Sequence, residues 1–201
     1  MNAEDRDARW MKLAIELAGK GLGLTSPNPC VGAVIVHKDQ IIGSGFHEKA
    51  GLPHAERNAI ADGIAKGNVG LFPDSTLYVT LEPCSTTGKT PPCTEAIMKH
   101  GFKRVVYGSE DPNPGHKGIA AEILKNAGIK VTRGVLEKEC DFLIRAFRLN
   151  MMEGRSWVIA KSAMSLDGHI SRSPERSQWL TGKAARSFVH TPVSYTHLRA
   201  H

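Results

Sequence analysis

Three residues of types that bind zinc occur in this sequence together with a nearby carboxylate. Glu56 follows His54 by two positions, and two cysteines come later, Cys84 and Cys93, separated by eight residues. One imidazole and two thiolates supply three zinc ligands and leave the fourth tetrahedral position open for water. Glu56 stays free to move protons, so the pattern predicts a hydrolytic zinc site.

The expected chemistry follows from these four residue types. Zinc bound by His54, Cys84 and Cys93 would lower the pKa of its water toward neutrality and supply a nucleophile for an amidine-like ring carbon. Glu56 would accept the proton of that water and deliver it to the leaving nitrogen. One residue separates Glu56 from His54, which keeps the carboxylate near the metal without binding it.

Two simpler interpretations compete with a catalytic site. His54 could be an ordinary polar residue and the cysteines packing residues, since each type alone is usually structural. A structural zinc site needs four protein ligands, but no fourth Cys or His stands at finger-like spacing, and Glu56 would then have no role. Together the residues match the H-x-E…P-C pattern of nucleobase deaminases, which favours catalysis.

Composition and charge set broad limits. The 201 residues are 41% hydrophobic and 23% charged, enough for one full globular domain plus a fragment of another. No apolar run reaches membrane-spanning length and the first residues are charged, so we expect a cytoplasmic protein with no membrane partner. Cys30 and Cys140 lie in apolar surroundings and are expected to be core thiols. The net charge of +6 permits an anionic partner but does not choose one.

The apolar periodicity predicts an alternation of strands and helices. Helices are expected over 5–21, 54–66, 94–99, 118–127 and 137–152, and strands over 30–36, 40–46, 75–81, 104–108 and 129–133. Both zinc-binding cysteines are expected at or near helix starts. This order predicts an α/β domain over residues 1–150, with helices on both faces of a sheet. A new strand is expected at 157–161 and a short helix at 181–189.

Several longer motifs carry a resemblance to a known family. They are Pro27-Asn28-Pro29-x-Val31-Gly32, His47, Gly51-x-Pro53-His54-Ala55-Glu56, Thr80-Leu81-Glu82-Pro83-Cys84, Gly88-Lys89-Thr90-Pro91-Pro92-Cys93 and Asp111-Pro112-Asn113-Pro114. On these motifs the chain resembles the cytidine-deaminase-like superfamily and, within it, the bifunctional riboflavin-biosynthesis deaminase/reductase family. The resemblance implies a three-layer α/β/α sandwich with a mixed central sheet, followed by the start of a second α/β domain similar to dihydrofolate reductase.

The resemblance also implies a substrate and residue roles. The substrate would be the phosphorylated pyrimidine 2,5-diamino-6-(5-phosphoribosylamino)pyrimidin-4-one, which loses its 2-amino group as ammonia. His54, Cys84 and Cys93 would hold zinc and Glu56 would shuttle protons. The residues implied in substrate binding are Asn28, Ala55, Lys89 and Asn113, with Lys89 near the phosphate. The chain departs from the family at Thr86, where histidine is common.

The second segment resembles the opening of the family's reductase domain. The matching stretches are 161–168, 177–181 and 185–190, which imply that Ala163 and Trp179 contact NADPH and Ser177 the substrate. Residues 151–190 are therefore expected to be a truncated reductase fragment without NADPH-dependent activity. After His190 the similarity is expected to end, because Pro192 would interrupt the helix that the family has at this place. Residues 191–201 are therefore expected to be a non-native tail.

Two rival functions differ in class from the pyrimidine deaminase. The positive charge permits a basic RNA-binding protein of the deaminase fold, but the eight-residue spacer between Cys84 and Cys93 is longer than such proteins generally have. No basic-aromatic run of the kind that stacks bases is present, so we expect no nucleic-acid partner. A nucleoside-acting deaminase and a non-catalytic zinc module also stay open, as does the formation of a homo-oligomer.

Overall fold

The computed structural model describes residues 2–86, 91–170 and 179–194. The chain divides into two units, residues 1–156 and 157–201. The first unit contains a five-stranded sheet, whose order is β2-β1-β3-β4-β5. The strands are β1 (Gly32–His37), β2 (Gln40–Phe46), β3 (Thr76–Leu81), β4 (Arg104–Ser109) and β5 (Lys130–Arg133).

The sheet is mixed, as expected. β1 pairs antiparallel with β2 and with β3, whereas β3, β4 and β5 run parallel to one another. β1 and β2 are joined at Lys38 and Asp39, which both have positive φ and make the tight reversal of a hairpin. The parallel strands are joined by helical crossovers instead, because parallel neighbours cannot be linked by a short turn.

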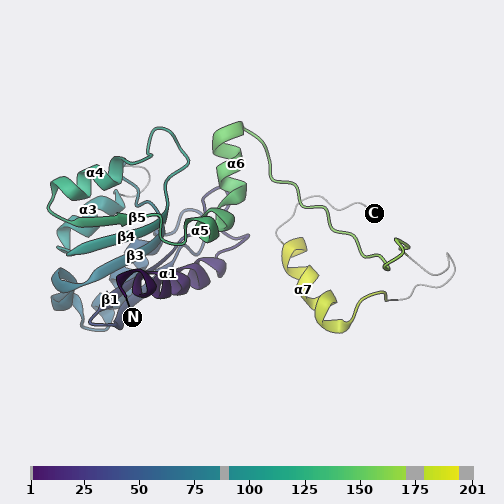
Figure 1. Cartoon of the computed structure of the whole chain (residues 1–201), viewed down its shortest axis with the longest axis horizontal. Helices are drawn as coiled ribbons and strands as arrows, with labels where there is room; N and C mark the ends of the chain where they lie inside the picture. The colour runs from purple at the N-terminus through teal and green to yellow at the C-terminus, as the bar shows by residue number, and fades with distance from the viewer. Residues whose placement is uncertain (1, 87–90, 171–178, 195–201) are drawn as a thin grey trace. The chain divides into compact units, whose positions relative to one another are not determined.

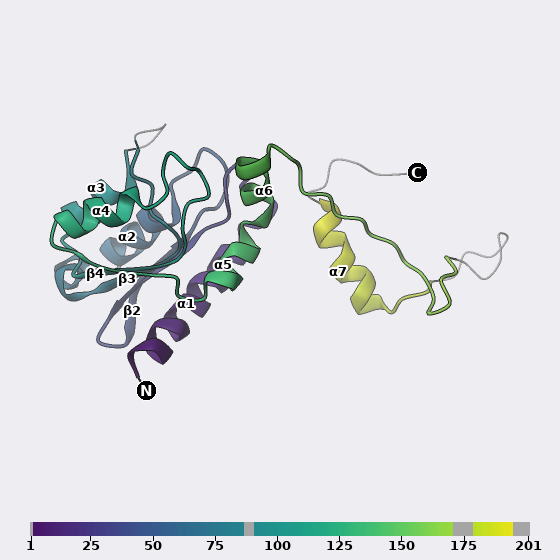
Figure 2. The same cartoon turned by 45° about the horizontal axis from the view of Figure 1, so that its top comes forward.

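Helices cover both faces of the sheet (Figure 1). α2 (Ala55–Ala65), α3 (Cys93–Lys99) and α4 (Ile119–Asn126) lie on one face, and α1 (Ala3–Gly19) and α5 (Glu137–Leu143) lie on the other (Figure 2). A 3₁₀ helix (Val69–Asp74) precedes β3, and α6 (Arg145–Glu153) ends the unit. The predicted three-layer α/β/α sandwich is therefore confirmed for this unit.

Two apolar cores follow from the alternation of side chains along each strand. On the α2 face, Ile35, Leu77 and Val105 are fully buried against the helices. On the α1 face, Val34 and Val106 pack with α1 residues. Alternate residues of one strand thus enter opposite cores, which fixes which side chains at the strand ends face the α2 side.

Several predicted boundaries differ from the observed ones. The single helix expected over 137–152 is two helices, α5 and α6, that meet at Ile144. No glycine or proline marks this break, so periodicity alone ran the two helices together. Of the two thiols expected at helix starts, Cys93 opens α3, but Cys84 lies in the irregular segment after β3.

The second unit contains one helix, α7 (Lys183–Ser194), among its described residues. The strand expected at 157–161 is absent, because this segment pairs with no other strand in the described parts of the chain. The expectation that Pro192 interrupts the helix is also wrong, since α7 continues through it to Ser194. Proline has a helix-compatible φ and removes only one backbone donor near the helix end. Ser177 lies outside the described residues.

Candidate zinc-dependent active site

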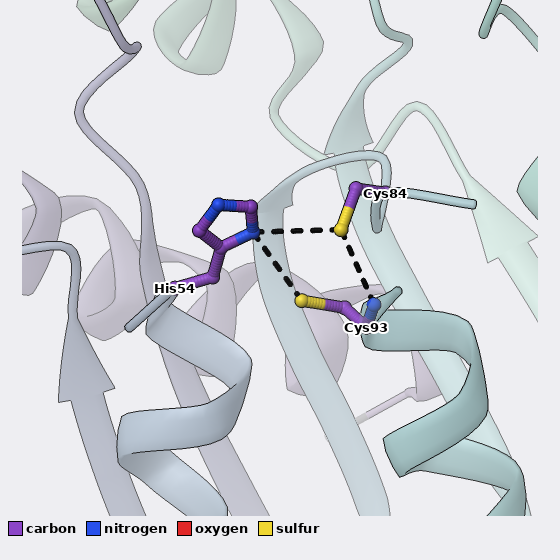
Figure 3. A group of neighbouring side chains, drawn as sticks. All are labelled: His54, Cys84 and Cys93. Carbon is purple, nitrogen blue, oxygen red and sulfur yellow. Dashed lines mark hydrogen bonds between the residues drawn. The ribbon is translucent and has the colours of Figure 1, made fainter. Parts of the chain in front are cut away.

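The residues predicted to bind zinc come together at the ends of three segments. His54 immediately precedes α2 and serves as its N-cap residue, Cys84 follows β3, and Cys93 is the first residue of α3. The Nδ1 atom of His54 lies 3.4 Å from the Sγ atom of Cys84 and 3.4 Å from that of Cys93 (Figure 3). The sequence separated these residues, but the fold places them in one cluster.

This spacing fits a zinc ion held by three protein ligands. The three ligand atoms all lie within 4.8 Å of one another. Tetrahedral zinc with nitrogen at about 2.1 Å and sulfur at about 2.3 Å separates these two ligand atoms by roughly 3.6 Å. The observed 3.4 Å separations are close to that value. No fourth His, Cys, Asp or Glu joins the group among the described residues, so one position stays open for a water or a substrate atom.

Backbone contacts hold the two cysteines in place. The backbone N–H of Cys93 donates to the Sγ atom of Cys84 at 3.2 Å, and the N–H of Thr94 donates to the Cys84 carbonyl oxygen at 3.2 Å. Arg57 on α2 donates to the carbonyl oxygens of Pro91 and Pro92, which ties the start of α3 to the helix that begins after His54.

The local electrostatics favour a thiolate in the cluster. Hydrogen bonds from the Cys93 thiol and from His54 lower the pKa of Cys84. The hydrogen bond to Cys84 in turn raises the pKa of His54. A thiolate is the form of cysteine that binds metal, so the cluster is prepared for a divalent cation.

Glu56 lies in the first turn of α2 and is 3% exposed. Burial, and then the negative charge of Cys84, raise the pKa of its carboxyl group to about 7. A nearby divalent cation acts in the opposite direction, because it stabilises the ionised form. A carboxyl group whose pKa lies near neutrality can both accept and release a proton at physiological pH.

A cavity of about 470 Å³ opens beside the cluster. Its lining includes His54, Glu56 and Cys84 together with Asn28 and Ala55, two of the residues implied in substrate binding. Asn113 is not among the lining residues, and its Oδ1 atom accepts from the N–H of Gly115 within its own loop at 3.0 Å. Lys89 lies outside the described residues. Ala163 and Trp179 lie in the second unit, where both are exposed.

Sequence reasoning left His47 without an assigned role. Its ring is buried, and its Nδ1 atom lies 3.0 Å from the carbonyl oxygen of Pro53. A carbonyl can only accept, so Nδ1 carries the hydrogen and Nε2 accepts from the side-chain amide of Asn28 at 3.1 Å. His47 therefore fixes the orientation of Asn28 at the cavity wall. Its only sequence signal was its place among the family motifs.

Glu82 was also missed, although it stands two residues before Cys84. Its buried carboxylate accepts from the backbone N–H groups of Asp111 (3.3 Å), Gly118 (2.9 Å) and Ala120 (3.1 Å). It therefore joins the end of β3 to the loop before α4, and this loop forms part of the cavity wall. Three donors to one carboxylate are strong charge-assisted contacts, but nothing in the local sequence pattern reveals them.

Comparison with known families and structures agrees with this geometry. Residues 4–109 match the cytidine and deoxycytidylate deaminase zinc-binding region, and the chain belongs to that family. Zinc is therefore the cofactor of this domain. Residues 156–196 match the RibD C-terminal domain, a match that runs beyond His190, where the similarity was expected to end.

Individual RibD proteins are similar to this chain over most of its length. The riboflavin biosynthesis protein RibD of Aquifex aeolicus is 46% identical over 92% of this chain and 50% of its own length. The diaminohydroxyphosphoribosylaminopyrimidine deaminase/5-amino-6-(5-phosphoribosylamino)uracil reductase of Thermotoga maritima is 46% identical with a TM-score of 0.87, over 95% of this chain and 54% of that one. The chain thus spans about half the length of these relatives. The Rib2 deaminase of Aspergillus oryzae in complex with DARIPP is 22% identical with a TM-score of 0.54, over 70% of this chain and 97% of that one, and supports the fold alone.

The described helices give one further fact about location. None of them combines the length and the apolar character that crossing a lipid bilayer requires.

Proposed function

We propose that this chain is a zinc-dependent hydrolase that deaminates 2,5-diamino-6-(5-phosphoribosylamino)pyrimidin-4-one. The products are 5-amino-6-(5-phosphoribosylamino)uracil and ammonia, a step of riboflavin biosynthesis. The observation that carries the proposal is the cluster of His54, Cys84 and Cys93 with the buried Glu56 on the wall of one open cavity. The similarity to RibD proteins supports the choice of substrate.

Each residue of the cluster has a definite task in this proposal. His54, Cys84 and Cys93 would hold the zinc ion, which when bound supplies Lewis-acid activation of a water molecule. Glu56 accepts a proton from the attacking water and passes it to the leaving nitrogen. The water oxygen becomes the new carbonyl oxygen at ring carbon 2, and the amino group leaves as ammonia. One carboxyl group can serve both proton transfers because Glu56 lines the cavity and is not one of the three candidate zinc ligands.

The proposed substrate-binding residues rest on two kinds of observation, the lining of the cavity and the family resemblance. Asn28 and Ala55 line the cavity and would contact the pyrimidine ring. Lys89 would contact the phosphate and Asn113 another part of the substrate, and both assignments rest on the family resemblance. The proposed partner is thus a phosphorylated pyrimidine, not a nucleic acid or a membrane. Homo-oligomer formation and a cytoplasmic location stay predictions.

We also propose a domain organisation for the chain. Residues 1–150 form the deaminase domain, and the start of a reductase domain follows from residue 151, with a family match that continues to residue 196. NADPH contacts at Ala163 and Trp179, and a substrate contact at Ser177, belong to the reductase part. In the described residues after 156 there is no strand whose end could hold a dinucleotide, so we expect no NADPH oxidation by this chain. NADPH absorbance, followed with the deaminated product, tests this, and turnover by the purified chain would contradict it.

Ammonia release is the direct test of the deaminase. The zinc-loaded chain is assayed with the phosphoribosylaminopyrimidine, cytidine, deoxycytidylate and adenosine at equal concentrations. We expect turnover of the first compound to exceed the others. A preference for cytidine or deoxycytidylate would favour the second candidate, a nucleoside- or nucleotide-acting deaminase, which the matched family description supports. Absence of ammonia from every compound, with zinc bound, would leave a non-catalytic zinc module.

A further inference from the structure

A contact of Arg57 joins the start of α2 to the start of α3, the two places where His54 and Cys93 lie. Arg57 is in the first turn of α2, three positions after His54. One nitrogen of its guanidinium donates to the carbonyl oxygens of Pro91 at 2.8 Å and Pro92 at 3.2 Å. Pro92 is the N-cap residue of α3, and Cys93 follows it directly. The contact therefore connects the helix that follows one zinc ligand to the residues that precede another.

The two prolines make this contact effective at Cys93. Each proline ring fixes its own φ angle and restricts the residue before it, so the backbone between Pro91 and Cys93 has few free torsions. Holding both carbonyl groups consequently restricts where the Cys93 thiol lies relative to His54, whose Nδ1 atom is 3.4 Å from Sγ (Figure 3). Arg57 is not among the residues that line the cavity of about 470 Å³, so it acts on the site through Cys93.

The position of Arg57 is unfavourable for its own helix. A positive charge in the first turn lies at the positive end of the helix dipole and lowers helix stability. The Nε atom of Arg57 is also buried and has no hydrogen-bond partner in the described parts of the chain, which costs further free energy. Local rules of this kind are commonly broken at functional sites, where another contact compensates. Here the compensating contact is the one to the prolines before Cys93.

A metal site binds more tightly when its ligands are already in place, because no binding free energy is lost in ordering them. We propose that Arg57 is a positioning residue that raises the affinity for zinc by holding Cys93 beside His54 before the metal binds. The inference goes beyond the proposed function, since it concerns the retention of zinc and not the choice of substrate.

The affinity for zinc tests this directly. The metal-free full chain is titrated with zinc in competition with a chromophoric chelator of known affinity, which gives the Kd. Arg57→Met keeps an unbranched stem and removes the hydrogen-bond donors. We expect its Kd for zinc to rise roughly 3- to 10-fold, at or below the low end of the range for residues that bond directly to a ligand side chain. An unchanged Kd overturns the proposal.

Lys99→Gln is the matched control. Lys99 is a cation at the end of α3 and lines the same small surface pocket as Arg57. The substitution removes a nearby positive charge and leaves the contact between Arg57 and the prolines intact, so the Kd should not change. A rise as large as that in Arg57→Met would show that charge is responsible, and it overturns the proposal. Should Arg57→Met fail to fold, Arg57→Gln, whose side chain is polar but shorter, is judged by the same criteria.

Amide hydrogen exchange in the metal-free chain separates positioning from a general loss of stability. The N–H groups of Cys93 and Thr94 donate to the Sγ atom and the carbonyl oxygen of Cys84. In Arg57→Met we expect exchange at these two amides to accelerate by a larger factor than at Val79, which lies within β3 between two paired strands. An equal factor at all three amides would mean that Arg57 acts on the whole fold, and the positioning role is then overturned.

These outcomes are distinguishable from a failure of the proposed deaminase. A chain whose zinc Kd depends on Arg57, but which releases no ammonia, refutes the proposed function and leaves this inference standing. Ammonia release by the unsubstituted chain, with an unchanged Kd in Arg57→Met, overturns this inference alone.

Discussion

The two units of the chain show what an apolar pattern needs in order to become structure. In the first unit Val34 is 1% exposed, because β1 pairs on both sides and α1 covers this face. In the second unit Val158 is 82% exposed, although its neighbours predicted a strand equally well. A strand requires neighbouring strands that satisfy its backbone groups, and an isolated segment has none. Periodicity therefore indicates what a segment can form, and its neighbours decide the result.

The difference extends to chemistry. In the first unit the half-buried His54 and Cys84 and the buried Glu56 line one cavity. In the second unit Ala163 and Trp179 are exposed, and the guanidinium group of Arg186 lies 4.5 Å from the centroid of the Trp179 ring. Substitutions at buried positions of the first unit and exposed positions of the second therefore test whether the two units differ in this way.

The largest expected effect is the loss of zinc from the first unit. Cys93→Ala removes one of three protein ligands, and we expect the purified chain to retain almost no zinc, because two ligands leave too weak a site. Elemental analysis measures the metal per chain. Cys30→Ala is the matched control, since Cys30 is also buried but lies outside the ligand cluster, and this variant should keep its zinc. Full occupancy in Cys93→Ala would refute the assignment.

The next effect concerns proton transfer at the same site. Glu56→Gln should keep zinc but lower kcat by roughly 10²-fold or more, because an amide can hydrogen-bond water yet cannot accept its proton. Ammonia release and zinc content are measured on the same preparation. Glu48→Gln, at an exposed position nearby in sequence, should behave like the unsubstituted chain. Near-normal turnover in Glu56→Gln would mean that another group carries the proton.

A third prediction compares one substitution in the two units. Leu77→Ala removes a fully buried side chain from β3, and we expect the free energy of unfolding to fall by about 2 to 5 kcal/mol. Leu166→Ala changes a fully exposed residue in a turn and should alter it by less than about 0.5 kcal/mol. Denaturant unfolding followed by circular dichroism measures both. Equal effects would show that the second unit has a core of its own.

Much of the first unit could be predicted because local and long-range signals agree there. The alternation in 75–81 and the helical spacing in 54–66 each gave an element close to the observed one, and the residues His54, Glu56, Cys84 and Cys93 marked the site by type and spacing.

The missed features depend on contacts that no local pattern encodes. Glu82 gains its role from backbone donors 29 to 38 residues away, and His47 from Asn28, 19 residues away. The break at Ile144 separates two helices of similar periodicity without a glycine or proline. The strand expected at 157–161 failed for the opposite reason, since the pattern was present but no strand among the described residues pairs with it.

The smallest expected effect comes from adding one hydroxyl at matched valines. Val34 is 1% exposed, so Val34→Thr places a hydroxyl in the core. A buried, unpaired hydroxyl lowers the free energy of unfolding by about 1 to 3 kcal/mol. Val158→Thr makes the same change where the side chain is 82% exposed, so water satisfies the hydroxyl and we expect a change of less than about 0.5 kcal/mol. Valine and threonine side chains have nearly the same shape, so the difference in stability between the two variants reports the effect of burial and not of side-chain volume. Shifts of the denaturation midpoint at a constant slope measure it. A loss of stability in Val158→Thr as large as that in Val34→Thr would mean that Val158 is covered in solution, and the contrast between the two units would then fail at this position.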